Sequence, residues 1–221
     1  MRKSPGKKIF SKANGSHAGP RGFSLIEMLI AMTVGLVVLG AMYNVFTIQN
    51  KAFGNQEEIV AMQQGVRAAM DMLAREVGMA GYDPVGVNSD TDGANDFSGV
   101  TVSGSQLQIK ADMRGANPND PPDGIIQATS QENTVYVFNA ANKRITRNIG
   151  AGAQPFAENI DAFTFEYLDG SGSVTAASAD VRRIRITITG RTTRPDPSYS
   201  PNGGYRTYTL ISVVAPRNLA F

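Results

Sequence analysis

The 221-residue sequence contains no cysteine, no tryptophan and a single histidine, His17. Without cysteine the chain has no disulfide framework, no thiolate zinc site and no cysteine nucleophile. One histidine in a Gly/Ser/Lys-rich head excludes a multi-histidine metal site and gives no basis for a histidine-centred triad. No G-x-S-x-G or P-loop motif is present either. The sequence therefore predicts a protein that is not an enzyme and uses no cofactor and no metal ion.

Acidic residues are absent from the first 22 positions, which carry six basic ones: Arg2, Lys3, Lys7, Lys8, Lys12 and Arg21. The formal net charge of the whole chain is +2, from 21 basic and 19 acidic side chains. The other 199 residues therefore hold 15 basic and 19 acidic side chains, a charge of −4. Because the body of the protein is mildly acidic, DNA is not an expected partner.

Met28 to Phe46 form an apolar run in which Thr33, Tyr43 and Asn44 are the only polar residues and none is charged. As a helix these 19 residues extend about 28 Å, close to the ~30 Å hydrocarbon core of a bilayer. The basic segment directly before the run places the N-terminus in the cytoplasm. We therefore expect a single-pass membrane protein whose C-terminal part lies outside the cytoplasm.

A distinctive junction lies ahead of this run. In a secretory signal peptide the cleavage site, marked by small residues, would instead follow the apolar run. Arg21 and Gly22 end the basic segment, Phe23 follows, and Glu27 stands at the entrance to the apolar run. A carboxylate costs about 2.5 to 3.5 kcal/mol at the centre of a membrane helix, so Glu27 requires a partner.

Two partners for Glu27 are consistent with the sequence. Cleavage after Gly22 would give Phe23 a free amino group one helical turn away, and a neighbouring copy would present the same group. Such a charge pair at ~4 Å contributes roughly 4 kcal/mol at an effective dielectric constant near 20. The alternative is that Glu27 interacts only with the helix dipole, which contributes ~0.3 to 1 kcal/mol.

The segment Gly22-Phe23-Ser24-Leu25-Ile26-Glu27 resembles the processing site of type IV prepilins and of type II secretion pseudopilins. The resemblance implies that a prepilin peptidase cuts after Gly22 and methylates the new N-terminal Phe23. It also implies that Glu27 pairs with the N-terminus of a neighbouring subunit during filament assembly.

Helical periodicity continues beyond the apolar run, with apolar residues at steps of three and four: Ile59, Met62, Val66, Ala69, Leu73, Val77 and Ala80. This stripe predicts an amphipathic continuation of the helix that ends near residues 78 to 84, where Gly and Pro occur. The intervening residues, Glu76 among them, are expected on a solvated face. Met62, Met70, Met72 and Met79 are expected to pack at core or near-core positions.

After Pro84 the period changes to two, as in 106–110, 134–138, 163–167, 184–188 and 208–214. Turn-rich loops separate these segments, so an antiparallel sheet is expected. The predicted fold class is α+β, with a long N-terminal helix, transmembrane in its first half, packed on an antiparallel β-sheet. The expected parts are a cleaved leader (1–22), a transmembrane half-helix (23–50), an exported half-helix (51–83) and a sheet domain (84–221).

The segment Gln63 to Tyr82 is similar to the post-membrane helix of the PilW family of minor pilins and of J-type minor pseudopilins. This resemblance implies a type IV pilin-like fold and a minor pilin that helps to start filament assembly, or else a minor pseudopilin of type II secretion. The implied partners are prepilin peptidase, major and minor pilin subunits and the inner-membrane assembly platform. The implied location is the inner membrane, with the N-terminus cytoplasmic and the C-terminal domain periplasmic, and then a pilus or a pseudopilus.

Two loops leave other functions open. Asn88 to Asp96 matches the first half of a calcium-binding loop, but Gly99 stands where the last, bidentate ligand is expected, so a solvated turn is favoured. The 190–205 loop contains arginines and tyrosines, and it would be the binding surface if the protein were a membrane-anchored adhesin or DNA-binding module.

Overall fold

The computed structural model describes residues 22–91 and 93–219, and it divides the chain into two compact units. The first unit ends at Lys51 and the second begins at Ala52. One α-helix, α1 (Leu25–Met79, 55 residues), supplies the helical part of both units. The leader before Gly22 lies outside the described residues.

The end of α1 is fixed by a left-handed turn and by the last part of the chain. Gly81 has a φ of 77°, a conformation typical of helix termination. The backbone amide of Arg217 donates to the Gly78 carbonyl at 3.2 Å, and the Asn218 side-chain amide donates to the Met79 carbonyl at 3.4 Å. These bonds satisfy carbonyls that a helix end leaves without partners. The predicted end near residues 78 to 84 is confirmed.

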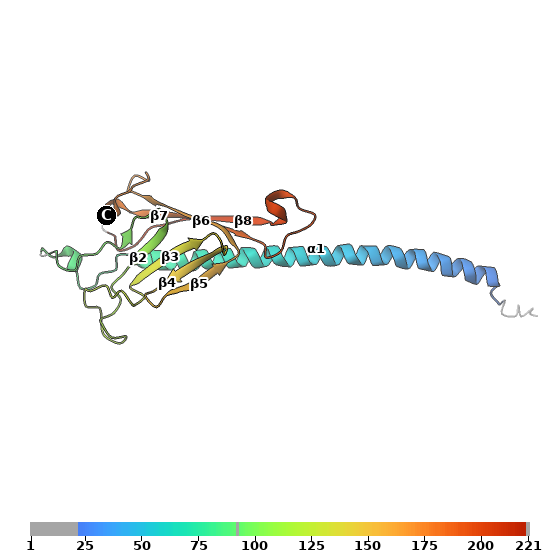
Figure 1. The fold of residues 1–221 in the computed structure, drawn as a ribbon, viewed down its shortest axis with the longest axis horizontal. Helices are drawn as coiled ribbons and strands as arrows, with labels where there is room; N and C mark the ends of the chain where they lie inside the picture. Colours follow the sequence, from blue (N-terminus) through green and yellow to red (C-terminus); the bar gives the residue numbers. More distant parts are fainter. Residues whose placement is uncertain (1–21, 92, 220–221) are drawn as a thin grey trace, which may run out of the picture. The chain divides into compact units, whose positions relative to one another are not determined.

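Two antiparallel sheets complete the second unit (Figure 1). The five-stranded sheet contains, in spatial order, β1 (Val100–Thr101), β2 (Gln106–Lys110), β3 (Asn133–Asn139), β4 (Arg144–Asn148) and β5 (Ala153–Glu158). The three-stranded sheet contains β6 (Ile160–Leu168), β7 (Arg183–Arg191) and β8 (Thr207–Val214). Three short 3₁₀ helices lie in the loops: Val87–Ser89, Ser178–Asp180 and Pro201–Gly204. The α+β fold class is confirmed, with the sheet divided in two.

The predicted apolar stripe of α1 forms the core between helix and sheets. Its last five members are buried and its first two, Ile59 and Met62, are half-buried. The five buried members share one cluster with the inward residues of both sheets, such as Tyr136 and Ile186. Two of the four methionines depart from the prediction, since Met72 and Met79 are 44% and 42% exposed. At about 100° per residue both fall on the side of the helix away from the buried stripe.

Glu76 also differs from the prediction, because it faces the five-stranded sheet and not solvent. Its carboxylate accepts a hydrogen bond from the Tyr136 hydroxyl on β3 and pairs with Arg147 Nη2 on β4 at 2.8 Å. Tyr136 is fully buried, and this burial, together with the Glu76 carboxylate, raises its pKa. The three side chains therefore tie the end of α1 to the sheet.

Candidate functional site

The predicted processing residues lie just ahead of α1. Gly22, Phe23 and Ser24 have no regular secondary structure, and the helix begins at Leu25. Phe23 is 90% exposed, and a Cβ added at Gly22 would meet no atom within 4 Å. An enzyme can therefore reach the backbone between Gly22 and Phe23 without first opening the helix.

Ser24 and Glu27 form a reciprocal capping box at the helix start. The Ser24 amide donates to Glu27 Oε2 at 3.0 Å, and the Glu27 amide donates to Ser24 Oγ at 3.2 Å. Each bond satisfies a backbone donor that the first turn of a helix leaves free. The box leaves Glu27 Oε1 without a hydrogen bond to any described residue. The carboxylate is thus held in one orientation with one oxygen available.

The apolar segment that follows is a candidate membrane span by length and composition. Its most apolar 18-residue window has a mean hydropathy of 2.3, and none of that window is buried within the structure. Polar side chains in it bond back to the helix: Thr33 to the Ile30 carbonyl at 2.8 Å and Asn44 to the Gly40 carbonyl at 3.1 Å. Such local bonds lower the cost of placing these groups in lipid.

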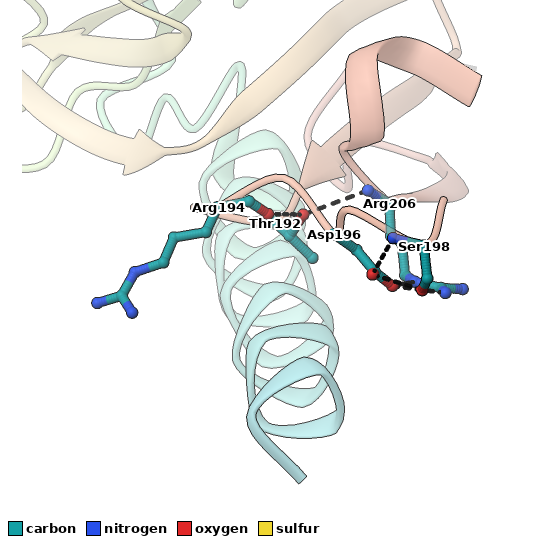
Figure 2. Close-up of polar contacts among 5 residues, drawn as sticks. All are labelled: Thr192, Arg194, Asp196, Ser198 and Arg206. Carbon is teal, nitrogen blue, oxygen red and sulfur yellow. Dashed lines mark hydrogen bonds and ion pairs between the residues drawn. The ribbon is translucent and has the colours of Figure 1, made fainter. Parts of the chain in front are cut away.

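The 190–205 loop uses most of its charged groups in its own contacts (Figure 2). Arg206 pairs with Asp196 through Nη2 at 2.7 Å and Nε at 3.0 Å, while Ser198 donates its amide and hydroxyl to the same carboxylate. The Ser198 hydroxyl and the Arg206 guanidinium lower the pKa of Asp196 to about 2. Arg191 lies over the Tyr205 ring, 4.3 Å from its centroid. Figure 2 shows Arg194 directed away from this cluster.

The possible calcium loop is organised by hydrogen bonds to its own backbone. Asp83 accepts the amides of Gly86, Val87 and Asn88 at 2.8 to 3.2 Å. Asn88 Oδ1 accepts the Phe97 amide at 2.8 Å. Asp92 lies outside the described residues. Within the described ranges, no group of three or more His, Cys, Asp or Glu residues is placed to hold a metal ion.

The capping role of Ser24 was not predicted from the sequence. The signal was present, because Ser-x-x-Glu directly before an apolar run is the pattern of a capping box. The interactions predicted for Glu27 were a partner amine or the helix dipole. The structure shows a third interaction, within the same chain.

Comparison with known proteins gives one family match. Residues 19–43 match the prokaryotic N-terminal methylation motif, of which 19–21 lie outside the described residues. A type IV-like pilin from Thermus thermophilus is similar in structure, with a TM-score of 0.44 and 16% identity, over 72% of this chain and 97% of that chain. No curated protein matches the sequence.

The motif and the fold together agree with the resemblance seen in the sequence. The motif covers the junction at Gly22 and most of the apolar run, and the long helix packs on antiparallel sheets. Residues 19–43 carry the methylation motif, and the apolar part of α1 is a candidate membrane span by length and composition. The chain thus carries a prokaryotic N-terminal methylation motif at the start of a long helix, and two antiparallel sheets follow that helix in the sequence.

Proposed function

We propose that the chain is a minor pilin of a type IV pilus, made as a precursor and cleaved between Gly22 and Phe23 by prepilin peptidase. The observation that carries the proposal is the N-terminal methylation motif over residues 19–43, with Glu27 held at the start of the apolar helix. Cleavage leaves an amino group on Phe23, which the same enzyme methylates. The leader, 1–22, is removed, and the mature chain begins with the helix.

In this proposal Glu27 directs assembly through its charge. An amine on a neighbouring subunit and the Glu27 carboxylate attract each other by roughly 4 kcal/mol at ~4 Å and an effective dielectric constant near 20. The orientation fixed by Ser24 reduces the side-chain entropy lost when that pair forms. Residues 23–50 span the inner membrane, 51–83 continue the helix in the periplasm, and the sheet domain, 84–221, meets its neighbours there.

The minor-pilin role is supported by the similarity of Gln63 to Tyr82 to the PilW-type helix and by the size of the sheet domain. The partners proposed are other pilin subunits and the inner-membrane assembly platform. A membrane-anchored DNA or adhesin module is less well supported, because Arg206 is paired with Asp196 and Arg191 is stacked on Tyr205. Cations free to contact phosphates are what DNA binding requires.

The test separates the charge of residue 27 from its capping role. Glu27→Gln removes the charge, yet Gln is able to complete the capping box. Ser24→Ala keeps the charge and removes the cap. With each variant expressed in cells that lack the natural chain, filaments are sheared off and the chain in them is quantified. We expect Glu27→Gln to be processed but at least tenfold depleted from filaments, with Ser24→Ala affected far less. Normal incorporation of Glu27→Gln would contradict the proposed function.

A further inference from the structure

Strand β8 lies at one edge of the three-stranded sheet, and only one of its two sides is paired. β7 pairs with it along its whole length, from Thr207 to Val214. Among the described residues, no backbone hydrogen bond engages the other side. The open side of an edge strand is a row of main-chain donors and acceptors that can pair with another chain. The open side of β8 is therefore able to bind an extended main chain.

The register of β7 and β8 shows which residues present these groups. The Thr192 amide donates to the Arg206 carbonyl at 2.9 Å, so this pair, one step before β8, is a hydrogen-bonded pair. Hydrogen-bonded and non-hydrogen-bonded pairs alternate along an antiparallel ladder, and the Thr189 and Thr209 hydroxyls, 2.9 Å apart, fit a non-hydrogen-bonded pair. The residues that direct their main-chain groups to the open side are therefore Thr207, Thr209, Ile211 and Val213.

The other edge strands of the described residues carry features that hinder pairing. β1 has two residues, and β5 contains Pro155. β6 has an irregular register between Ile160 and Ala162 and carries the charged Glu166. Short edges, prolines, bulges and charges are the means by which proteins prevent strand pairing. β8, with the sequence TYTLISVV, has a regular register and neither a proline nor a charged residue. Its edge is thus left open to pairing.

Side chains on both faces of β8 define the chemistry of a matching segment. On the outer face Ile211 and Val213 are 59% and 49% exposed. On the inner face Tyr208, Leu210 and Val214 are only partly buried against the core. A strand added to the open side would place its own side chains beside these apolar ones on each face. The matching segment is therefore extended, uncharged and apolar on both faces.

The direction of β8 distinguishes a second copy of this chain from another subunit. The Thr193 amide, beside the start of β8, donates to Glu58 at 2.9 Å, and the Arg217 amide, just after β8, donates to the Gly78 carbonyl. β8 thus runs in the same direction as α1. Antiparallel pairing of two β8 strands would point the two α1 helices in opposite directions. Under the proposed function both helices are anchored in one membrane, which excludes that pairing.

We propose that the open side of β8 binds an extended, uncharged segment of a different subunit, which joins the three-stranded sheet as an antiparallel fourth strand. The inference rests on the proposed function, which brings other subunits to this chain, and it adds the surface that one of them occupies. Antiparallel pairing is slightly more stable per residue than parallel pairing. Main-chain hydrogen bonds supply the affinity in such strand addition, and the alternating side chains supply the specificity.

Amide hydrogen exchange tests the added strand directly, by comparison of the chain in sheared filaments with the same chain alone in detergent micelles. We expect the amides of Thr209, Ile211 and Val213 to exchange at least tenfold more slowly in filaments. The amides of Leu210 and Ser212, which face β7, are the internal control and should be slow in both samples. Equal exchange of the first three amides in both samples would overturn the inference, whereas the proposed function would still stand if Glu27→Gln were depleted.

Protection that is already present in micelles and rises with protein concentration would also overturn the inference, because it would identify a second copy as the occupant. If the natural chain is absent from filaments, the proposed function and this inference fail together.

Substitutions of Ile211 separate the main chain from the side chain. Ile211→Pro removes an amide on the open side, a position where an edge strand tolerates proline, while Ile211→Val keeps the amide and the apolar contact. We expect Ile211→Pro to be depleted from filaments at least tenfold and Ile211→Val to stay within twofold of the natural chain. Equal incorporation of the two variants would contradict the inference.

A charge at the same position gives a variant that keeps the backbone intact. Ile211→Lys places a charge at the open edge, where the side chain is exposed and folding of the single chain is little affected. Thr164→Lys is the matched control, because Thr164 lies on the same face of the sheet, two strands away. We expect only Ile211→Lys to be depleted from filaments. If both lysine variants are incorporated alike, the open edge of β8 is not the binding surface.

Discussion

At the scale of single residues, the structure shows one interaction of Glu27, and the proposed function assigns it a second. Its Oε2 accepts the Ser24 amide, which stabilises the helix start inside one chain. Its other oxygen is available to a cation from another chain, as the proposed function requires. Under the proposed function the helix start and the assembly contact use the same side chain, and only substitutions that separate charge from hydrogen bonding distinguish them.

Ser24→Ala tests the capping role directly. Loss of an N-cap side chain costs typically ~1 kcal/mol, so amide exchange in the first helical turn should become about fivefold faster. Hydrogen exchange of the chain in detergent micelles measures this, with Ser24→Thr as the variant that keeps the cap. Exchange that is equal in Ser24→Ala and the natural chain would show that the capping box adds no stability.

The low pKa of Asp196 predicts how the 190–205 loop responds to acid. The pKa is lowered from 3.8 to about 2 by the Ser198 hydroxyl and the Arg206 guanidinium, so the ionised form is favoured in the folded loop. The stability from this group is fully present above pH 3.8 and is lost as the pH falls through about 2. Proton NMR of the chain in micelles should report titration of Asp196 near that lower value.

Asp196→Asn is the matching substitution at neutral pH. It keeps the shape of the side chain but removes the charge that holds Arg206, so trypsin should cut after Arg206 more rapidly than in the natural chain. Ser171→Ala, on an exposed turn elsewhere, serves as the control. Unchanged cleavage in Asp196→Asn would mean that the ion pair does not order the loop.

At the scale of secondary-structure elements, contacts made by Glu76 join α1 to the five-stranded sheet. Tyr136→Phe removes the hydroxyl that donates to Glu76 and should lower the free energy of unfolding by about 1.5 to 3 kcal/mol, as for other hydrogen bonds to charged groups. Denaturant unfolding in micelles measures the change. The control is Glu166→Ala, which breaks an exposed pair with Arg185 and should cost about 0 to 1 kcal/mol. Equal effects would contradict the account.

Gly190 on β7 lies close to side chains of α1. A Cβ at this position would lie 2.4 Å from Val66 Cγ2 and 3.3 Å from Met62 Cγ. Gly190→Ala should therefore destabilise the second unit by about 1 to 3 kcal/mol, the usual cost of overpacking. Gly104→Ala, where the added Cβ meets no atom within 4 Å, should leave stability nearly unchanged. A stable Gly190→Ala variant would show that helix and sheet separate easily.

Strands could be predicted where apolar and polar residues alternate along the sequence. Ile184, Ile186 and Ile188 are fully buried between outward polar residues, and their spacing alone identified β7. β4 and β5 were missed, since RITRN holds one apolar residue and AQPFAE contains Pro155 in an edge strand. β1 has only two residues. The division into two sheets depends on long-range pairing, which local periodicity does not encode.

At the scale of the whole molecule, the prepilin-type N-terminus could be predicted because its signals are contiguous in sequence. A basic segment, Gly22-Phe23, Glu27 and an apolar run lie within 46 residues, and residues 19–43 of them match a family motif. The Glu76 network was not predictable in the same way, because its partners on β3 and β4 are 60 and 71 positions away. The N-terminal motif was therefore identified from the sequence, whereas the contacts of Glu76 were found only in the structure.

The central claim is that the protein works only after its leader has been removed. Mass spectrometry of the chain purified from membranes or filaments of cells with active prepilin peptidase tests this most directly. The account predicts a mature chain that starts at Phe23 and carries one methyl group on its amino nitrogen. A chain that keeps residues 1–22, or that starts at an unmodified residue elsewhere, would contradict it.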